Sequence, residues 1–130
     1  VMHMLRSDAP HFDRFGEIYF STVLPGATKA WKRHKKMILN VTVPVGKVHL
    51  VAFDGRTQSR SYNKIDEFIL GPNDLYALIK IPPLIWFGFQ NTGSSAALLA
   101  NCATIPHEKN ETEQWDINEA SIEFDWSIKP

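Results

Sequence analysis

The strongest constraint on the fold is a series of short β-prone runs separated by turn residues. The runs begin about every ten residues, a spacing typical of a β-sandwich or β-barrel. We expect strands at 17–23, 28–34, 39–43, 47–53, 65–70, 76–81, 86–91 and 97–102. Turn-forming residues lie between them, including Pro25-Gly26, Asp54-Gly55 and Asn91-Thr92-Gly93. The sequence therefore predicts an all-β fold.

The rest of the chain carries weaker signals. No stretch of it has the 3.6-residue period of an amphipathic helix. Residues 106–120 are polar and acidic, so we expect a polar loop or a short helical turn there. Ser121 to Trp126 alternates apolar and polar residues, and we expect it to form a last strand. With 130 residues, 44% of them hydrophobic, the chain is expected to form a single domain, 1–130, around one core.

Composition argues against several classes of protein. The 14 basic and 14 acidic residues balance and form no basic stripe, so we expect no nucleic-acid partner. Cys102 is the only cysteine, which excludes an intrachain disulfide and favours the cytoplasm. No apolar run approaches the ~20 residues of a membrane span, and the first residues do not form a signal peptide. We therefore expect no membrane partner.

One spacing narrows the choice among all-β barrels. Gly26 is followed by five residues and then Lys32, with His34 two positions later. Leu39 follows after four more residues and Gly46 after six. This frame resembles the first motif of the cupins, in which two histidines and a glutamate lie between two glycines. The resemblance predicts a cupin-type double-stranded β-helix, or jelly roll, with Lys32 and Leu39 in place of two metal ligands.

A second cupin frame follows in the right order. Pro82 is followed five residues later by Phe87 and nine later by Asn91. Phe87 stands where the motif has a histidine, and Leu84 where it has a glycine. Three of the four metal-ligand positions are thus changed, and a lone histidine cannot hold a transition metal. We predict a barrel with no metal and no cofactor.

Several short segments, in order, resemble the dTDP-4-dehydrorhamnose 3,5-epimerase family. The segments lie between Gly16 and Trp126 and are Asp54-Gly55-Arg56, Ile81-Pro82 with Gly88-Phe89, Cys102, Trp115-Asp116-Ile117-Asn118 and Phe124-Asp125-Trp126. The resemblance implies an isomerase of a nucleotide-linked 4-keto-6-deoxy sugar in polysaccharide biosynthesis. It also implies a homodimer that pairs through exchanged N-terminal strands. In the family a histidine removes protons beside the C4 ketone and a tyrosine on the opposite face acts as the acid; these positions are Lys32 and Ala100 here.

Lys32 and His34 are the candidate catalytic residues. Because residues two apart share one face of a strand, both side chains are expected to point into the barrel. We expect the Lys32 ammonium to be desolvated near His34, so that its free amine could act as the base. Two other interpretations remain open. The chain could be a non-catalytic cupin that binds a sugar or sugar nucleotide, or a structural subunit whose barrel is filled by its own side chains.

Four further residues are candidate substrate-binding groups. The resemblance places Lys29 where the family has an arginine that holds the diphosphate, and a lysine can do this as a point charge. Trp86 could stack on a sugar or base. Asn40 and Asn101 could bond to sugar hydroxyls. His49 lies between Val48 and Leu50 and is expected to face solvent.

Overall fold

The computed structural model describes residues 1–130 and contains nine β-strands and no helix. The strands are β1 (Glu17–Val23), β2 (Thr28–His34), β3 (Leu39–Val45), β4 (Val48–Asp54), β5 (Ile65–Leu70), β6 (Ile79–Ile81), β7 (Ile85–Asn91), β8 (Ala97–Ala103) and β9 (Thr112–Gln114). The all-β prediction is confirmed, and β1, β2 and β5 have the expected bounds. The structure has no helix long and apolar enough to cross a membrane.

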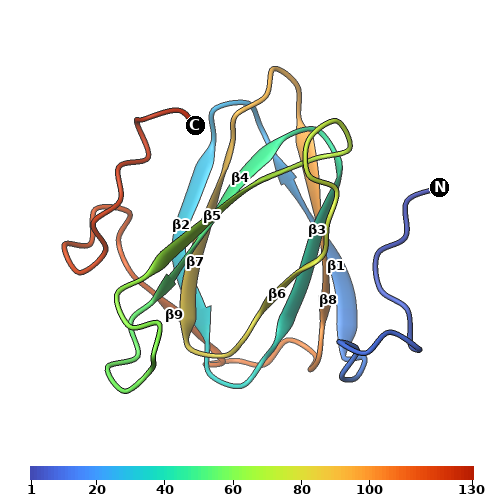
Figure 1. Cartoon of the computed structure of the whole chain (residues 1–130), viewed down its shortest axis with the longest axis horizontal. Helices are drawn as coiled ribbons and strands as arrows, with labels where there is room; N and C mark the ends of the chain where they lie inside the picture. The colour runs from blue at the N-terminus through green and yellow to red at the C-terminus, as the bar shows by residue number, and fades with distance from the viewer.

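The strands form two antiparallel sheets that face each other (Figure 1). One sheet has the order β1-β8-β3-β6 and the other β5-β4-β7-β2-β9. Successive strands alternate between the sheets over much of the chain, which is the connectivity of a jelly roll. The consecutive strands β1 and β2 are joined by one short turn, although they belong to different sheets.

Three turns keep the geometry that the cupin frame predicts. Gly26 and Gly46 have φ angles of 77° and 86°, a left-handed conformation that glycine adopts without a steric penalty. Leu84, at the position where the second motif has a glycine, has a φ of 67°. A non-glycine residue there carries about 1–2 kcal/mol of strain. The turn before β7 therefore survives the loss of its glycine.

The main hydrophobic core lies between the two sheets. Strand alternation sends Val48 and Leu50 of β4 inward, and both are fully buried. Leu39 and Val41 of β3 and Leu99 of β8 meet them from the opposite sheet. Each such side chain contributes roughly 1.5–3 kcal/mol on burial. This core also forms the floor of the cavity described below.

A second apolar cluster lies on the outer face of the five-stranded sheet. Trp31, Val51, Phe53 and Trp86 project outward from its strands, and the C-terminal segment 115–126 covers them. Figure 1 shows this last segment running along the outside of the sheet that contains β2 and β7. The ring centroids of Trp31 and Trp126 are 5.3 Å apart.

The segments outside the main strands differ from expectation. β9 lies within the predicted polar loop because its backbone pairs with the free edge of β2. Residues 121–126 form no strand, since they pack across the face of the sheet instead of along an edge. His49 is 2% exposed rather than facing solvent, because Phe124 and Trp126 lie over it with ring centroids 5.8 Å away.

Candidate functional site

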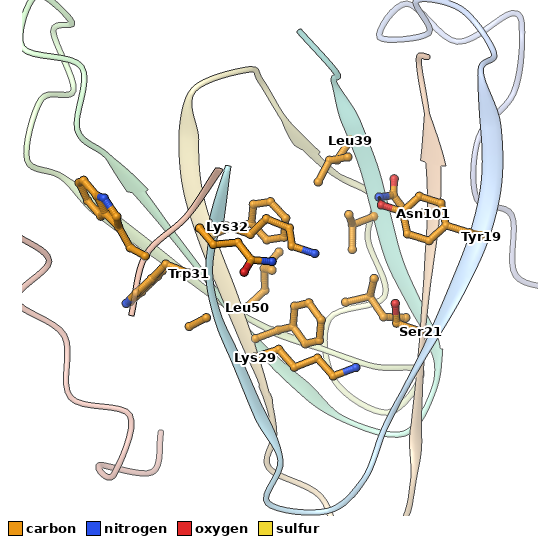
Figure 2. Close-up of a pocket in the computed structure, with 15 residues that line it drawn as sticks. Tyr19, Ser21, Lys29, Trp31, Lys32, Leu39, Leu50 and Asn101 are labelled. Carbon is orange, nitrogen blue, oxygen red and sulfur yellow. Dashed lines mark hydrogen bonds between the residues drawn. The ribbon is translucent and has the colours of Figure 1, made fainter. Parts of the chain in front are cut away.

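A cavity of about 360 Å³ lies between the two sheets. Figure 2 shows its lining side chains projecting from β2 on one side and from β1, β3 and β8 on the other. Its floor is apolar, formed by Leu39, Val41, Leu50, Phe87, Phe89 and Leu99. The polar groups stand on the two facing walls. The barrel is therefore open rather than filled by its own side chains.

Lys29 and Lys32 form the basic wall of the cavity. Residues three apart point to opposite faces of a regular strand. In β2, however, Lys29 pairs with Phe89 while Lys32 pairs with Phe87, so the register shifts by one residue between them. This bulge brings both lysines to the inner face. Neither forms an ion pair with a carboxylate.

Lys32 differs in one respect from the sequence prediction. Its side chain reaches into the cavity, as expected, but the residue is exposed, as is Lys29. The expected desolvation is wrong, because the two sheets separate between β1 and β2 and leave the lysines at an open mouth. Both ammonium groups are therefore accessible to a ligand that enters from solvent.

The opposite wall carries hydrogen-bonding groups from β1 and β8. Tyr19 and Ser21 project from β1, and Asn101 from β8. Tyr19 and Asn101 are direct cross-strand partners, and the Asn101 side-chain Nδ2 donates a hydrogen bond of 2.8 Å to the Tyr19 hydroxyl oxygen. Figure 2 shows this pair facing Lys32 across the cavity. The site thus places cations on one sheet and neutral polar groups on the other.

A second cavity of about 340 Å³ adjoins the first at the end of the barrel. Its lining residues are Glu17, Tyr19, Lys32, His34, Met37, His107 and Thr112. Tyr19 and Lys32 line both cavities. The two spaces therefore meet at these two side chains.

His34 is buried at the end of β2. Its ring stacks on Phe87 with centroids 6.2 Å apart, and Nδ1 lies 3.5 Å from the Thr112 hydroxyl and 3.7 Å from Glu111 Oε2. Burial lowers the pKa of His34; Glu111 opposes this effect, while Lys32 and His107 add to it. The ring is therefore neutral at pH 7.

Glu111 is a site residue that the sequence did not reveal. It is 5% exposed, and its Oε2 accepts hydrogen bonds of 2.9 Å from the backbone N–H groups of Lys36 and Met37. Burial favours a raised pKa for Glu111, but these hydrogen bonds and His34 outweigh it and lower the pKa. Its place in a polar, acidic loop gave no signal, because its partners lie more than 70 residues earlier in the chain.

Two predicted substrate-binding residues do not reach the cavity. Asn40 is buried in β3, where its side-chain Nδ2 donates to the Cys102 carbonyl oxygen at 2.9 Å. Trp86 faces the outer side of its sheet, stacked on Trp115 with ring centroids 3.9 Å apart. Alternation along β7 explains the error, because Phe87 takes the inward position next to Trp86. Lys29 and Asn101 do line the cavity, as predicted.

Three of the four cupin ligand positions hold no group suited to a metal, and only His34 is left. Lys32, Leu39 and Phe87 all line the cavity. Nowhere does the structure gather three His, Cys, Asp or Glu side chains that could hold a metal ion. The absence of a bound metal stays a prediction.

A jelly roll with an open, ligand-sized cavity between its sheets defines the cupin class of barrel. No family model matches the chain. The crystal structure of a dTDP sugar isomerase from Desulfovibrio desulfuricans, however, is 47% identical, with a TM-score of 0.96 over 100% of this chain and 83% of that chain. The chain belongs to this family of dTDP-sugar isomerases and dTDP-4-dehydrorhamnose 3,5-epimerases, and the resemblance seen in the sequence is confirmed.

The chain is also similar to two more distant proteins. The chain is 28% identical to the probable low-salt glycan biosynthesis epimerase Agl13 of Haloferax volcanii, over 99% of this chain and 85% of the relative. A dTDP-4-dehydrorhamnose 3,5-epimerase from Elizabethkingia anophelis is 19% identical and has a TM-score of 0.78 over 89% of this chain and 64% of that chain. At that identity the match shows a common fold.

Proposed function

We propose that the chain is a sugar-nucleotide epimerase that acts on a nucleotide-linked 4-keto-6-deoxy sugar in glycan or polysaccharide biosynthesis. The observation that carries the proposal is the open cavity in which Lys29 and Lys32, without carboxylate partners, face Tyr19 and Asn101 across an apolar floor. Cations suit a diphosphate, and hydroxyl and amide groups suit a sugar. Relatives named as a dTDP sugar isomerase and a glycan biosynthesis epimerase support this choice.

The proposed chemistry begins with proton removal beside the ketone. The fraction of Lys32 that is in the free-amine form takes a proton from the carbon next to C4, and the electron pair of the broken C–H bond moves into an enolate. Lys29 holds the diphosphate as a point charge. His34, neutral and on the same face of β2, is the partner that can take up the proton from Lys32. Return of a proton to the other face of the carbon completes the inversion.

The two alternatives have less support. A structural subunit with a plugged barrel does not fit a cavity of about 360 Å³. A non-catalytic cupin that binds a sugar nucleotide fits the cavity, but the relatives named as an isomerase and an epimerase do not favour it. Exchange of substrate protons with solvent separates binding from catalysis.

The proposal also includes the setting of the enzyme. We propose a homodimer that works in the cytoplasm without a cofactor. The single buried cysteine fits a reducing compartment. The free edge of β1 offers a strand through which two chains could pair.

The first test replaces the proposed base. Lys32→Met keeps the length of the side chain and removes its charge. We expect the rate of deuterium uptake beside the ketone to fall by about 10²–10⁴-fold, the usual contribution of a general base. We also expect unchanged or slightly higher thermal stability, because the cation that faces Lys29 and His34 is gone. The measurements are NMR of a dTDP-linked 4-keto-6-deoxy sugar in deuterated water and thermal unfolding.

The matched control is Lys64→Met, an exposed lysine before β5, which should exchange at the parent rate. If Lys32→Met binds and exchanges like the parent, Lys32 is not the base. If the parent neither binds nor exchanges any sugar from a panel with dTDP, UDP, GDP and CDP, the enzyme assignment itself is wrong.

A further inference from the structure

Tyr19 is the side chain that faces both cavities from the four-stranded sheet, opposite Lys32. It lies on β1 between Ile18 and Phe20, whose side chains are exposed on the outer face of the sheet, so its phenol points inward. It lines both cavities, as only Lys32 also does, and it reaches them from the opposite sheet (Figure 2). A flat sugar ring held between the two sheets would present one face to Lys32 and the other to Tyr19.

The hydrogen bonds around Tyr19 fix the direction in which its proton can go. The Asn101 side chain is oriented because its Oδ1 accepts from the backbone N–H of Asn40 at 3.3 Å. Its Nδ2 must then donate to the Tyr19 oxygen, at 2.8 Å. The phenol oxygen is thus an acceptor in this pair, and its own hydrogen has no acceptor in the protein. That hydrogen is free for a ligand in the cavity.

The protonation state agrees with a donor role. Burial raises the pKa of Tyr19; the hydrogen bond from Asn101 opposes this, and the nearby Glu17 adds to the rise. The phenol therefore keeps its proton at neutral pH. The other two tyrosines do not line either cavity. Tyr62 is exposed, and the Tyr76 hydroxyl donates to the His3 carbonyl oxygen.

We propose that Tyr19 is the acid that delivers a proton to the substrate carbon on the face opposite Lys32. This step rests on the proposed function. After Lys32 has removed the first proton, the enolate electron pair forms a new C–H bond with the Tyr19 phenol hydrogen, and the O–H bond electrons stay on a phenolate. Lys32 then passes its proton to water by way of the neutral His34, and the phenolate regains one from water, so the enzyme is restored without an oxidant or a reductant. Ala100, where the family has its tyrosine, has no group for this step.

The test separates proton exchange from inversion. Tyr19→Phe keeps the ring and removes the hydroxyl, so Lys32 can still remove a proton and return one to the same face. With a dTDP-linked 4-keto-6-deoxy sugar in deuterated water, we expect deuterium uptake to continue while inversion falls by about 10²–10⁴-fold. Tyr62→Phe is the matched control and should exchange and invert like the parent. Thermal unfolding shows whether each variant is folded.

Three results would overturn the assignment. The assignment is wrong if Tyr19→Phe inverts at the parent rate, and it is equally wrong if this variant loses exchange and inversion in parallel. Site-specific 3-fluorotyrosine at position 19, which keeps the hydroxyl but makes it more acidic, should move the alkaline limit of the inversion rate to lower pH. An unmoved limit counts against Tyr19 as the acid. A parent that neither exchanges nor inverts would instead refute the proposed function.

Discussion

Asp54 is a buried carboxylate at the residue where β4 ends and the loop to β5 begins. It is 5% exposed and accepts hydrogen bonds from the Arg56 guanidinium at 2.9 and 3.0 Å and from the Ser61 hydroxyl. The Arg56 guanidinium, followed by Ser61, the backbone N–H of Arg56 and Ser59, holds the pKa of Asp54 well below its usual value against the effect of burial. This carboxylate is therefore charged in the folded protein and ties the loop together.

We predict that Asp54→Asn destabilises the protein and changes its acid sensitivity. The folded-state pKa lies below the unfolded one, so the stabilisation is complete above the ordinary aspartate pKa of about 3.9 and is lost as the pH falls below it. Asp54→Asn should lower the free energy of unfolding at pH 7 by about 2–3 kcal/mol. It should also flatten the loss of stability below about pH 4. Urea unfolding between pH 3 and pH 7 measures both effects.

Asp66→Asn, an exposed residue on β5, is the control and should stay within about 0.5 kcal/mol of the parent. A parent-like pH profile for Asp54→Asn would show that the carboxylate carries no such stabilisation.

The sequence predicted which residues line the cavity better than it predicted the hydrogen bonds that hold those residues in place. The cupin spacing predicted that Lys32 faces inward and the family resemblance pointed to Lys29, and both line the cavity. The sequence did not predict the exposure of the two lysines, which depends on how far the two sheets separate. Tyr19 follows the alternation of β1, but nothing local shows that Asn101 bonds to it. Such contacts join distant strands and leave no mark on short-range patterns.

The C-terminal segment is the element whose role the sequence misjudged. Its alternation resembles a strand, yet Trp126 packs flat against β7 beside Gly88 rather than joining an edge. A Cβ at Gly88 would lie only 2.8 Å from Trp126 Cζ2, so the missing side chain makes room for the indole. The Trp126 carbonyl oxygen also accepts a bond of 3.3 Å from Gln90 Nε2. Alternating residues can thus cover a sheet face as well as extend a sheet.

We predict that Trp126→Ala weakens the cover of this face. Trp126 is 7% exposed and contacts Trp31, Phe124 and His49, so truncation leaves a cavity in the outer cluster. The expected loss is about 3–5 kcal/mol in the free energy of unfolding. Limited proteolysis should also cut the chain after residue 115 faster than in the parent.

Ile128→Ala, two residues further on and 67% exposed, is the control and should unfold like the parent. Equal stability and equal cleavage for the two variants would mean that Trp126 does not hold the segment in place.

The cavity between the two sheets exists because the sheets separate along one side of the barrel. β1 and β2 are neighbours in the chain but belong to different sheets and do not pair with each other, so no backbone ladder closes the barrel between them. β9 and Trp115 extend the sheet beyond β2, where the Trp31 and Trp115 backbones exchange hydrogen bonds of 3.0 and 3.1 Å. The sequence predicted the strands that build this barrel, but the opening results from the final sheet order.

The same sheet order leaves β1 with one free edge and an apolar outer face. β1 pairs only with β8, and Ile18 and Phe20 are 53% and 62% exposed beside the unpaired edge. Such an edge favours pairing with another chain.

We predict a homodimer in which β1 is at the interface, so light scattering at ~10 μM should give twice the mass of one chain. The double variant Ile18→Glu/Phe20→Glu should give a folded monomer, because four carboxylates would meet across the two-fold interface, whereas Ile128→Glu should remain dimeric. A monomeric parent at this concentration would contradict the prediction, and a dimeric double variant would place the interface elsewhere on the surface.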